Sequence, residues 1–156
     1  SSDLDTKDAP ALTLSRTVEV AGAMSPTEPG PVRNASEVDG YTVTLTGDLT
    51  AGATAPLTAE FSRGGEPVTE LSPYLGAFGH LVALREGDLA FLHVHPTGAE
   101  PAPGSRGGPA ISFAAQAPTS GRYLLYLDFQ VDGRVHTATF VVDAAAAPRN
   151  VSAENP

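Results

Sequence analysis

Apolar and polar side chains alternate along several short stretches of this sequence, as they do in half-buried β-strands. The stretch "YTVTLTG" places Tyr41, Val43 and Leu45 on one side of an extended chain and three threonines on the other. The stretch "PLTAEF" repeats the alternation, and so do "RYLLYLDFQV" and "RVHTATFVV" near the end of the chain. No stretch shows the periodicity of an amphipathic helix. The pattern therefore predicts antiparallel strands that each bury one face.

Turn signals separate these stretches at short intervals. The sequence has 16 Gly and 14 Pro, and Asp132-Gly133 lies between the last two alternating runs. An Asp-Gly pair favours a two-residue hairpin because both central residues of a type I′ turn need positive φ. Many short strands joined by such turns are typical of a sandwich. We expect an all-β protein, an immunoglobulin-like antiparallel β-sandwich of about seven to eight strands.

A chain of 156 residues fits one domain and is long enough to bury a core. We expect a single β-sandwich domain over residues 11–143. Residues 1–10 and 144–156 are polar or low in complexity, and we expect disordered tails there. Within the domain, "LTLSRTVEV" is a candidate edge strand, and residues 22–40 have no periodicity and are expected to form a loop.

Three of the four histidines lie in the stretch "GHLVALREGDLAFLHVHP", which reads as two strands joined by a turn. With Glu86-Gly87 as the two central turn residues, His80 lies opposite His93, and His95 is diagonal to His80. Because side chains alternate along a strand, the three rings share one face. Facing Cβ atoms are about 4.5 to 5.5 Å apart and diagonal ones about 7 to 8 Å. Imidazoles at these separations can reach one ion.

The second hairpin adds the fourth histidine. With Asp132-Gly133 as its turn, His136 lies opposite Phe129 on the apolar face of the hairpin, which must be the core side. If the strand "GHLVALR" lies antiparallel beside "RYLLYLDFQV", His80 comes to the same end of the sandwich as this turn. We therefore expect the four histidines to converge there as metal ligands: His80, His93, His95 and His136.

Four neutral imidazoles suit Cu(II) or Zn(II). The chain has no Cys and one Met, so it lacks the thiolate of a blue-copper centre and the soft ligands that Cu(I) prefers. Copper binds more tightly than zinc at equal site quality, and we expect Cu(II), with Zn(II) as the alternative. The plain alternative is a group of solvated histidines together with one core histidine that is satisfied by another polar group.

The charge of the chain limits its partners. Eighteen acidic and nine basic side chains give a net charge of −9, which repels nucleic acid and anionic membrane surfaces and attracts cations. No apolar run is long enough to span a bilayer. The composition is typical of an exported protein, extracellular or in the cell envelope, with a lipid anchor before processing as one route. Its expected partners are a metal ion and another exported metal-handling protein, and no pattern indicates an oligomeric state.

Motifs of common enzymes are missing. The sequence contains no G-x-S-x-G nucleophile elbow, no Walker A loop and no G-x-G-x-x-G fingerprint, and "GSRGG" lacks the Lys of a phosphate loop. We predict no catalytic and no organic cofactor-binding residues. The expected function is therefore binding of a metal for buffering, delivery or resistance. The alternatives are a copper-dependent redox enzyme with superoxide dismutase-like chemistry and a metal-free β-sandwich interaction module.

Two segments also resemble a known family. "SPYLGAFGHLVALREGDLAFLHVHPTG" and "PTSGRYLLYLDFQVDGRVHTATFVV" resemble exported bacterial immunoglobulin-like domains associated with heavy-metal and copper handling, which are often encoded as lipoproteins. The resemblance covers about half the chain and is most specific at "G-H" and "H-x-H-P". It implies His80, His93 and His95 as metal ligands. The tripeptide "HVH" is also similar to the copper-binding strand of copper/zinc superoxide dismutases, but that match ends there.

Overall fold

The computed structural model describes residues 30–149, and their regular structure consists of β-strands. Three of the strands, β3, β5 and β6, have two residues each. The other eight are longer and agree with the predicted seven to eight strands. In chain order the strands are β1 (Ala35–Val38), β2 (Tyr41–Thr46), β3 (Leu49–Thr50), β4 (Thr54–Arg63), β5 (Glu66–Pro67), β6 (Leu71–Ser72), β7 (Gly79–Arg85), β8 (Phe91–Pro96), β9 (Ala110–Gln116), β10 (Gly121–Val131) and β11 (Arg134–Ala145).

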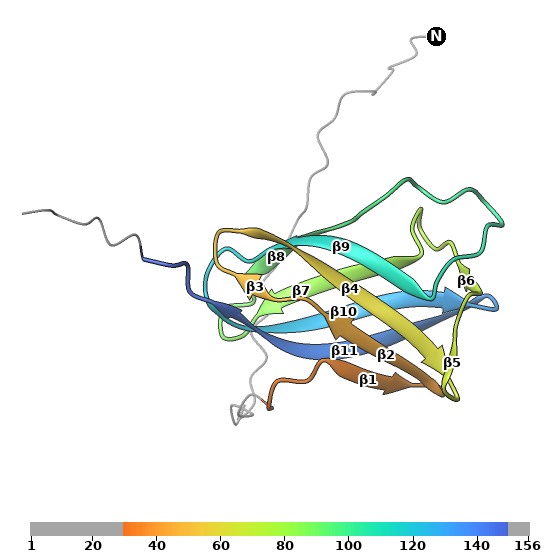
Figure 1. The fold of residues 1–156 in the computed structure, drawn as a ribbon, viewed down its shortest axis with the longest axis horizontal. Helices are drawn as coiled ribbons and strands as arrows, with labels where there is room; N and C mark the ends of the chain where they lie inside the picture. Colours follow the sequence, from red (N-terminus) through yellow and green to blue (C-terminus); the bar gives the residue numbers. More distant parts are fainter. Residues whose placement is uncertain (1–29, 150–156) are drawn as a thin grey trace, which may run out of the picture.

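The strands form two layers that are joined through β8 (Figure 1). One layer contains β1, β2, β4, β5 and β9, and the other contains β3, β6, β7, β10 and β11. Strand β8 pairs with β7 at its start and with β9 afterwards, so the layers are parts of one curled sheet. The pairs are antiparallel except β11 with β3. The predicted class, an all-β immunoglobulin-like sandwich, is confirmed.

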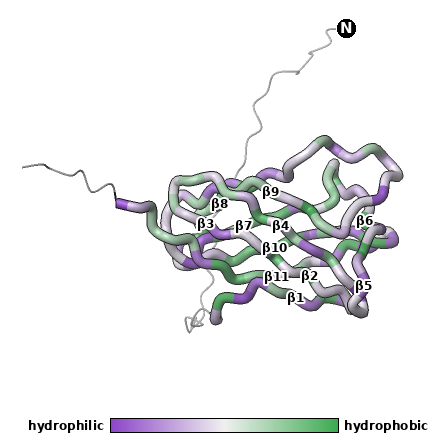
Figure 2. Tube along the Cα trace, viewed as in Figure 1, coloured by the Kyte–Doolittle hydropathy of each residue, from purple (hydrophilic) through white to green (hydrophobic). Residues whose placement is uncertain are grey.

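The core lies between the layers and is built from the alternating apolar positions of the strands. Figure 2 shows this alternation as changes between green and purple along the strands. Burying one face of each strand is the driving force that selects this register, because a slip of one residue would expose the apolar set. The largest fully buried side chains are Tyr123, Phe61, Phe113, Phe129, Phe140, Leu57, Leu71, Leu125, Leu127 and Val43.

The β10–β11 hairpin has the predicted register. Phe129 pairs with His136, and Asp132 and Gly133 form the turn with φ values of 51° and 74°. Strand β7 lies antiparallel beside β10, also as predicted, with Gly79 opposite Phe129. The start of β7 therefore lies at the end of the sandwich that carries the Asp132-Gly133 turn.

The β7–β8 hairpin differs from the predicted one. Leu84 pairs with Phe91 instead of Leu89, so the connecting loop is longer than a two-residue turn. Leu89 has a φ of 57° and is exposed, and Arg85 forms a two-pronged ion pair with Asp88 inside the loop. This ion pair accounts for the difference, because it stabilises a loop that the turn rules alone do not specify. The predicted pairing of His80 with His93 is therefore wrong.

The two layers approach each other a second time along β1 and β11. The backbone N–H groups of Arg33 and Val141 each donate to the other residue's carbonyl oxygen, at 2.8 and 2.9 Å. Further along the two strands, the backbone N–H of Thr139 donates to the hydroxyl of Ser36 at 3.1 Å. We call this boundary the β1–β11 seam.

The strand ends modify the predicted domain limits. Strand β11 continues through Ala145, and Ala144 is buried and pairs with β3, so the domain extends beyond the predicted boundary at residue 143. Strand β1 lies in the segment 22–40, where a loop was expected. The predicted tail over residues 1–10 and the candidate strand "LTLSRTVEV" lie outside the described residues.

Candidate functional site

His93 and His95 lie side by side on the outer face of β8. Their ring centroids are 4.4 Å apart, and the ring planes are inclined by 75°. Strand alternation explains the arrangement, since Leu92 and Val94 point toward the core and leave the two histidines on the solvent side. Both histidines are exposed. The sequence prediction that these two rings share one face is confirmed.

The surroundings leave both rings open. His93 lies opposite Gln116 and His95 opposite Ala114 on β9, and the small side chain of Ala114 leaves room beside His95. Among residues 30–149, no side-chain hydrogen bond involves either ring. Each ring in its neutral form therefore has a nitrogen lone pair that can bind a metal ion without first breaking a contact in the described part of the chain.

His80 lies on the outer face of the other layer. It pairs with Asp128 on β10 and is half-buried. Its Nε2–H donates to the backbone carbonyl oxygen of Tyr74 at 2.5 Å, and the tyrosine ring contacts the imidazole edge-on at 5.8 Å between centroids. This hydrogen bond fixes the ring against the loop that precedes β7. His80 thus has a structural partner of its own.

His136 is buried in the core, with 5% of its surface exposed. Its ring lies between Tyr41 and Phe129, at 5.0 and 5.3 Å between centroids. Its Nδ1–H donates to Oδ2 of Asp39 at 2.6 Å across the β1–β11 seam. This hydrogen bond is the main reason that the pKa of Asp39 lies below its ordinary value. His136 is therefore a core histidine that is satisfied by another polar group, as the alternative to a metal ligand predicts.

Sequence reasoning missed Asp39, although a signal for it was present. Asp39-Gly40 precedes the alternating stretch "YTVTLTG" just as Asp132-Gly133 precedes the last strand. The two residues have φ values of 50° and 81°, as a type I′ turn requires. Had this pair been recognised as a hairpin turn, β1 would have been predicted, and Asp39 would have been placed at the same end of the sandwich as His136.

The predicted convergence of four histidines does not occur. His80 lies opposite Asp128 and His136 opposite Phe129, and these consecutive residues of β10 point to opposite faces of the layer. Strand β8 leaves β7 after Leu92 and carries His93 and His95 to the other layer. Within the described range 30–149, no group of three or more His, Asp or Glu side chains is arranged to hold a metal ion.

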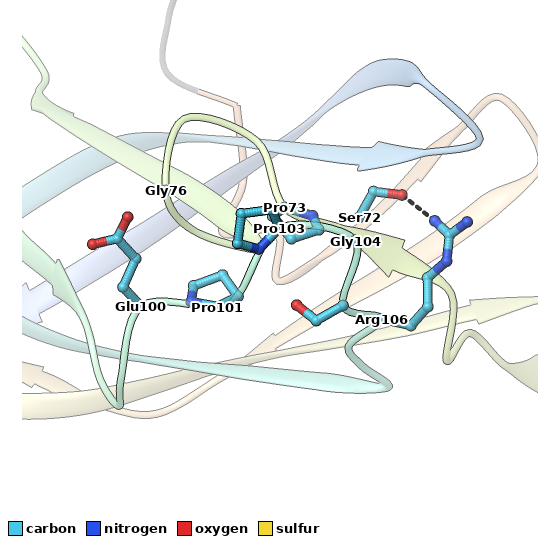
Figure 3. A pocket seen from close by; sticks show the side chains of 9 residues that line it. Ser72, Pro73, Gly76, Glu100, Pro101, Pro103, Gly104 and Arg106 are labelled. Carbon is cyan, nitrogen blue, oxygen red and sulfur yellow. Dashed lines mark hydrogen bonds between the residues drawn. The ribbon is translucent and has the colours of Figure 1, made fainter.

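A separate hollow of about 470 Å³ lies among the loops that flank β6. Figure 3 shows that Glu100 and Arg106 lie at its opposite ends, with proline rings between them, and that Arg106 donates to the hydroxyl of Ser72. The carboxylate of Glu100 and the guanidinium group of Arg106 do not contact each other. None of the four histidines lines it, so it offers no ligand to a site built on His93 and His95.

The described residues form an all-β sandwich domain that carries an exposed histidine pair on the outer face of β8. The chain belongs to the family described as "Domain of unknown function (DUF8832)", whose model matches residues 36–146. This range begins in β1 and ends just after β11. No curated protein matches the chain.

One solved structure with a similar course of the chain is the GAE domain of GGA2p from Saccharomyces cerevisiae. It is 10% identical to this chain, with a TM-score of 0.38, and the match covers 76% of this chain and 99% of that domain. Within residues 30–149, no helix is long and apolar enough to cross a membrane.

Proposed function

We propose that this protein binds Cu(II), or alternatively Zn(II), at His93 and His95 and releases it again to a partner. The observation that carries the proposal is the close pair of exposed rings, 4.4 Å apart, without hydrogen-bond partners among the described residues. Imidazole nitrogen is a preferred ligand of both metals. The metal ion is cargo here, because two protein ligands leave most coordination positions to water or to a partner.

The number of ligands favours copper over zinc. Structural zinc sites are closed by four protein ligands, and catalytic ones keep three. Cu(II) accepts tetragonal coordination by nitrogen and oxygen, and two neighbouring imidazoles with water satisfy part of it. At equal site quality Cu(II) also binds more tightly than Zn(II). We therefore expect Cu(II) to be preferred, with an affinity below that of a closed four-histidine site.

The charge and composition of the chain support the same proposal. A net charge of −9 attracts cations, and the absence of Cys leaves imidazole as the strongest transition-metal ligand in the chain. We place the protein outside the cytoplasm, where it would buffer copper or deliver it to another exported metal-handling protein. Because the ligands must be neutral, affinity falls as the pH drops through the range in which imidazoles take up protons.

The test is a competitive titration of Cu(II) and Zn(II) into untagged protein and three variants. We expect the wild type to bind one Cu(II). His93→Ala and His95→Ala should each weaken binding about tenfold or more, because each removes half of the protein ligands.

His80→Ala is the matched control, since it removes a histidine that lies outside the pair, and it should bind as the wild type does. A His93→Ala/His95→Ala double variant that binds Cu(II) as tightly as the wild type would refute the proposal. An equal loss in His80→Ala would also contradict it.

A further inference from the structure

A second group of functional side chains lies at the end of the sandwich where the Asp39-Gly40 and Asp132-Gly133 turns meet. They surround a hollow of about 220 Å³. A neighbouring hollow of about 270 Å³ shares part of its wall. We call the first one the turn-end hollow, and its lining residues are Asp39, Tyr41, Arg63, Val131, Asp132, Arg134 and His136.

Two arginines from opposite layers border the turn-end hollow. Arg63 pairs with Tyr41, and Arg134 pairs with Val131. Tyr41 and Val131 are buried at 5% and 4% exposure, so both arginines occupy inward-facing positions at the last rung of their strands. The end of the core is therefore bordered by guanidinium groups rather than by apolar side chains.

Neither arginine forms a close ion pair in the described part of the chain, although the charge of Arg134 contributes to lowering the pKa of Asp39. The ion pairs among residues 30–149 are formed by Arg85, Arg122 and His136. Arg63 donates to the hydroxyl of Tyr41 at 3.1 Å, and its guanidinium carbon lies 4.9 Å from the centre of that ring. These contacts hold Arg63 in place and leave most of its five N–H donors available.

His136 supplies an acceptor to the same space. It is 95% buried, and its Nδ1–H is committed to Asp39. Its Nε2 has no hydrogen-bond partner among the described residues, yet no fully enclosed side-chain nitrogen or oxygen atom in this range lacks a partner. Solvent therefore reaches Nε2, and the hollow that His136 lines provides the access. In the neutral ring with a proton on Nδ1, Nε2 carries a lone pair.

Two carboxylates also line the hollow. Asp39 is oriented toward His136 by their hydrogen bond, and that bond is the main cause of its lowered pKa. Asp132 is exposed in the turn. The two carboxylates and the two guanidinium groups of this hollow balance in charge, and Glu66 and Glu70 line the neighbouring hollow, so anions are not bound by net charge alone. Recognition has to come from the placement of the guanidinium donors and of the Nε2 acceptor of His136.

We propose that the turn-end hollow binds a small phosphate-class oxyanion, either inorganic phosphate or the terminal group of a phosphate monoester. Guanidinium groups donate in forks that match two oxygens of such an anion. The hydroxyl of a singly protonated phosphate group donates to Nε2 of His136, which a carboxylate cannot do. The hollow is smaller than the roughly 300 to 1,000 Å³ of typical cofactor pockets, so it fits an ion or a small group.

This site is independent of the proposed copper site. It lies between the two layers at the turn end, and its histidine faces the core, whereas His93 and His95 face outward from β8. Phosphate binding can therefore be measured on metal-free protein in the presence of a chelator. Failure of either proposal leaves the other intact.

The test is an NMR titration of metal-free protein at constant ionic strength, with the imidazole signals of His136 as the readout. Inorganic phosphate, glycerol phosphate and acetate are the three probes. We expect a saturable shift with phosphate and a weaker response to acetate. Tighter binding of glycerol phosphate than of inorganic phosphate would assign the natural ligand to the monoesters, and the reverse would assign it to the free ion.

The variants are Arg63→Gln and Arg134→Gln, with Arg106→Gln as the matched control. Each of the first two should raise the dissociation constant for phosphate about tenfold, because each removes charge-assisted hydrogen bonds. All three side chains are exposed, so the variants should remain folded, and their backbone spectra check this. Equal responses to phosphate and acetate, or unchanged binding in an Arg63→Gln/Arg134→Gln double variant, would overturn the proposal.

Discussion

Asp88 sets the geometry of the β7–β8 loop. Its carboxylate accepts two hydrogen bonds from Arg85 and one from the backbone N–H of Ala90. The hydrogen bonds from Arg85 are the main reason that the pKa of Asp88 falls from its ordinary 3.8 to about 2. A carboxyl group with a lowered pKa stabilises the folded state at any pH above its ordinary pKa and loses this effect as the pH falls toward the lower value.

Replacing Asp88 by Asn removes this pH-dependent contribution to the stability of the folded state. Asp88→Asn should be less stable than the wild type at pH 5 to 7, and the difference should shrink as the pH falls from about 4 to about 2. Urea unfolding midpoints of the two proteins across this range measure it. The other carboxyl groups are common to both proteins and cancel in the comparison. A difference that stays constant down to pH 2 would show that the ion pair does not form.

Gly47 provides a second prediction at the scale of one residue. Its φ is 123°, and an added Cβ would lie directly against the carbonyl oxygen of Pro56. Gly52 has a similarly unusual φ of 77° but open space around the added Cβ. Gly47→Ala combines strain with a clash and should lower the free energy of unfolding by about 3 kcal/mol or more, whereas Gly52→Ala should lower it by about 1 kcal/mol.

Thermal or urea unfolding of the two glycine variants tests this ranking. Both substitutions remove the same conformational freedom from the unfolded chain, so Gly52→Ala controls for that effect. Equal losses at the two positions would mean that the backbone around Gly47 relaxes away from Pro56.

At the scale of elements, the pairing of β8 determines which histidines lie close enough to bind one metal ion. Its first two residues pair with β7, and the segment from His93 to Pro96 pairs with β9. Because β8 changes partner in this way, it joins the two layers. The part of β8 that carries His93 and His95 therefore no longer lies beside β7. The alternation of side chains along β8 is the same whichever neighbour it has. The sequence could therefore predict the His93–His95 pair but not its separation from His80.

Strand β11 yields a prediction for the β1–β11 seam. The backbone N–H groups of Val141 and Thr139 point away from β10 and donate across the seam. By strand alternation, the N–H groups of Thr137 and Val135 point the same way, and none of the described backbone groups accepts from them. Amide hydrogen exchange should be slow at Val141 and Thr139 and much faster at Thr137 and Val135. Uniform protection along β11 would show that β1 continues further along this edge.

At the scale of the whole molecule, local pairing could be predicted better than the arrangement of the layers. Asp132-Gly133 fixed one hairpin correctly, because the turn type depends on two residues. The β7–β8 loop depends on an ion pair that turn rules do not include. The predicted convergence of His80 and His136 is wrong for a different reason. Both residues lie at the same end of the sandwich, but on opposite faces of one layer. A shared end does not imply a shared face.

The central claim is that His93 and His95 alone form the metal site. Of the four predicted ligands, the structure brings together His93 and His95, which are also the two in the motif "H-x-H-P". Asp39 accepts a hydrogen bond from Nδ1–H of His136, and the carbonyl oxygen of Tyr74 accepts one from Nε2–H of His80. The proposed copper site is therefore an open pair of ligands, suited to exchange rather than to permanent storage.

The most direct test of this claim is the electron paramagnetic resonance spectrum of the untagged protein with less than one equivalent of Cu(II). Pulsed measurements on Cu(II) count the coordinated imidazoles. We expect two in the wild type, one in His95→Ala, and two in His80→Ala. The same imidazole signals in a His93→Ala/His95→Ala double variant as in the wild type would contradict the account.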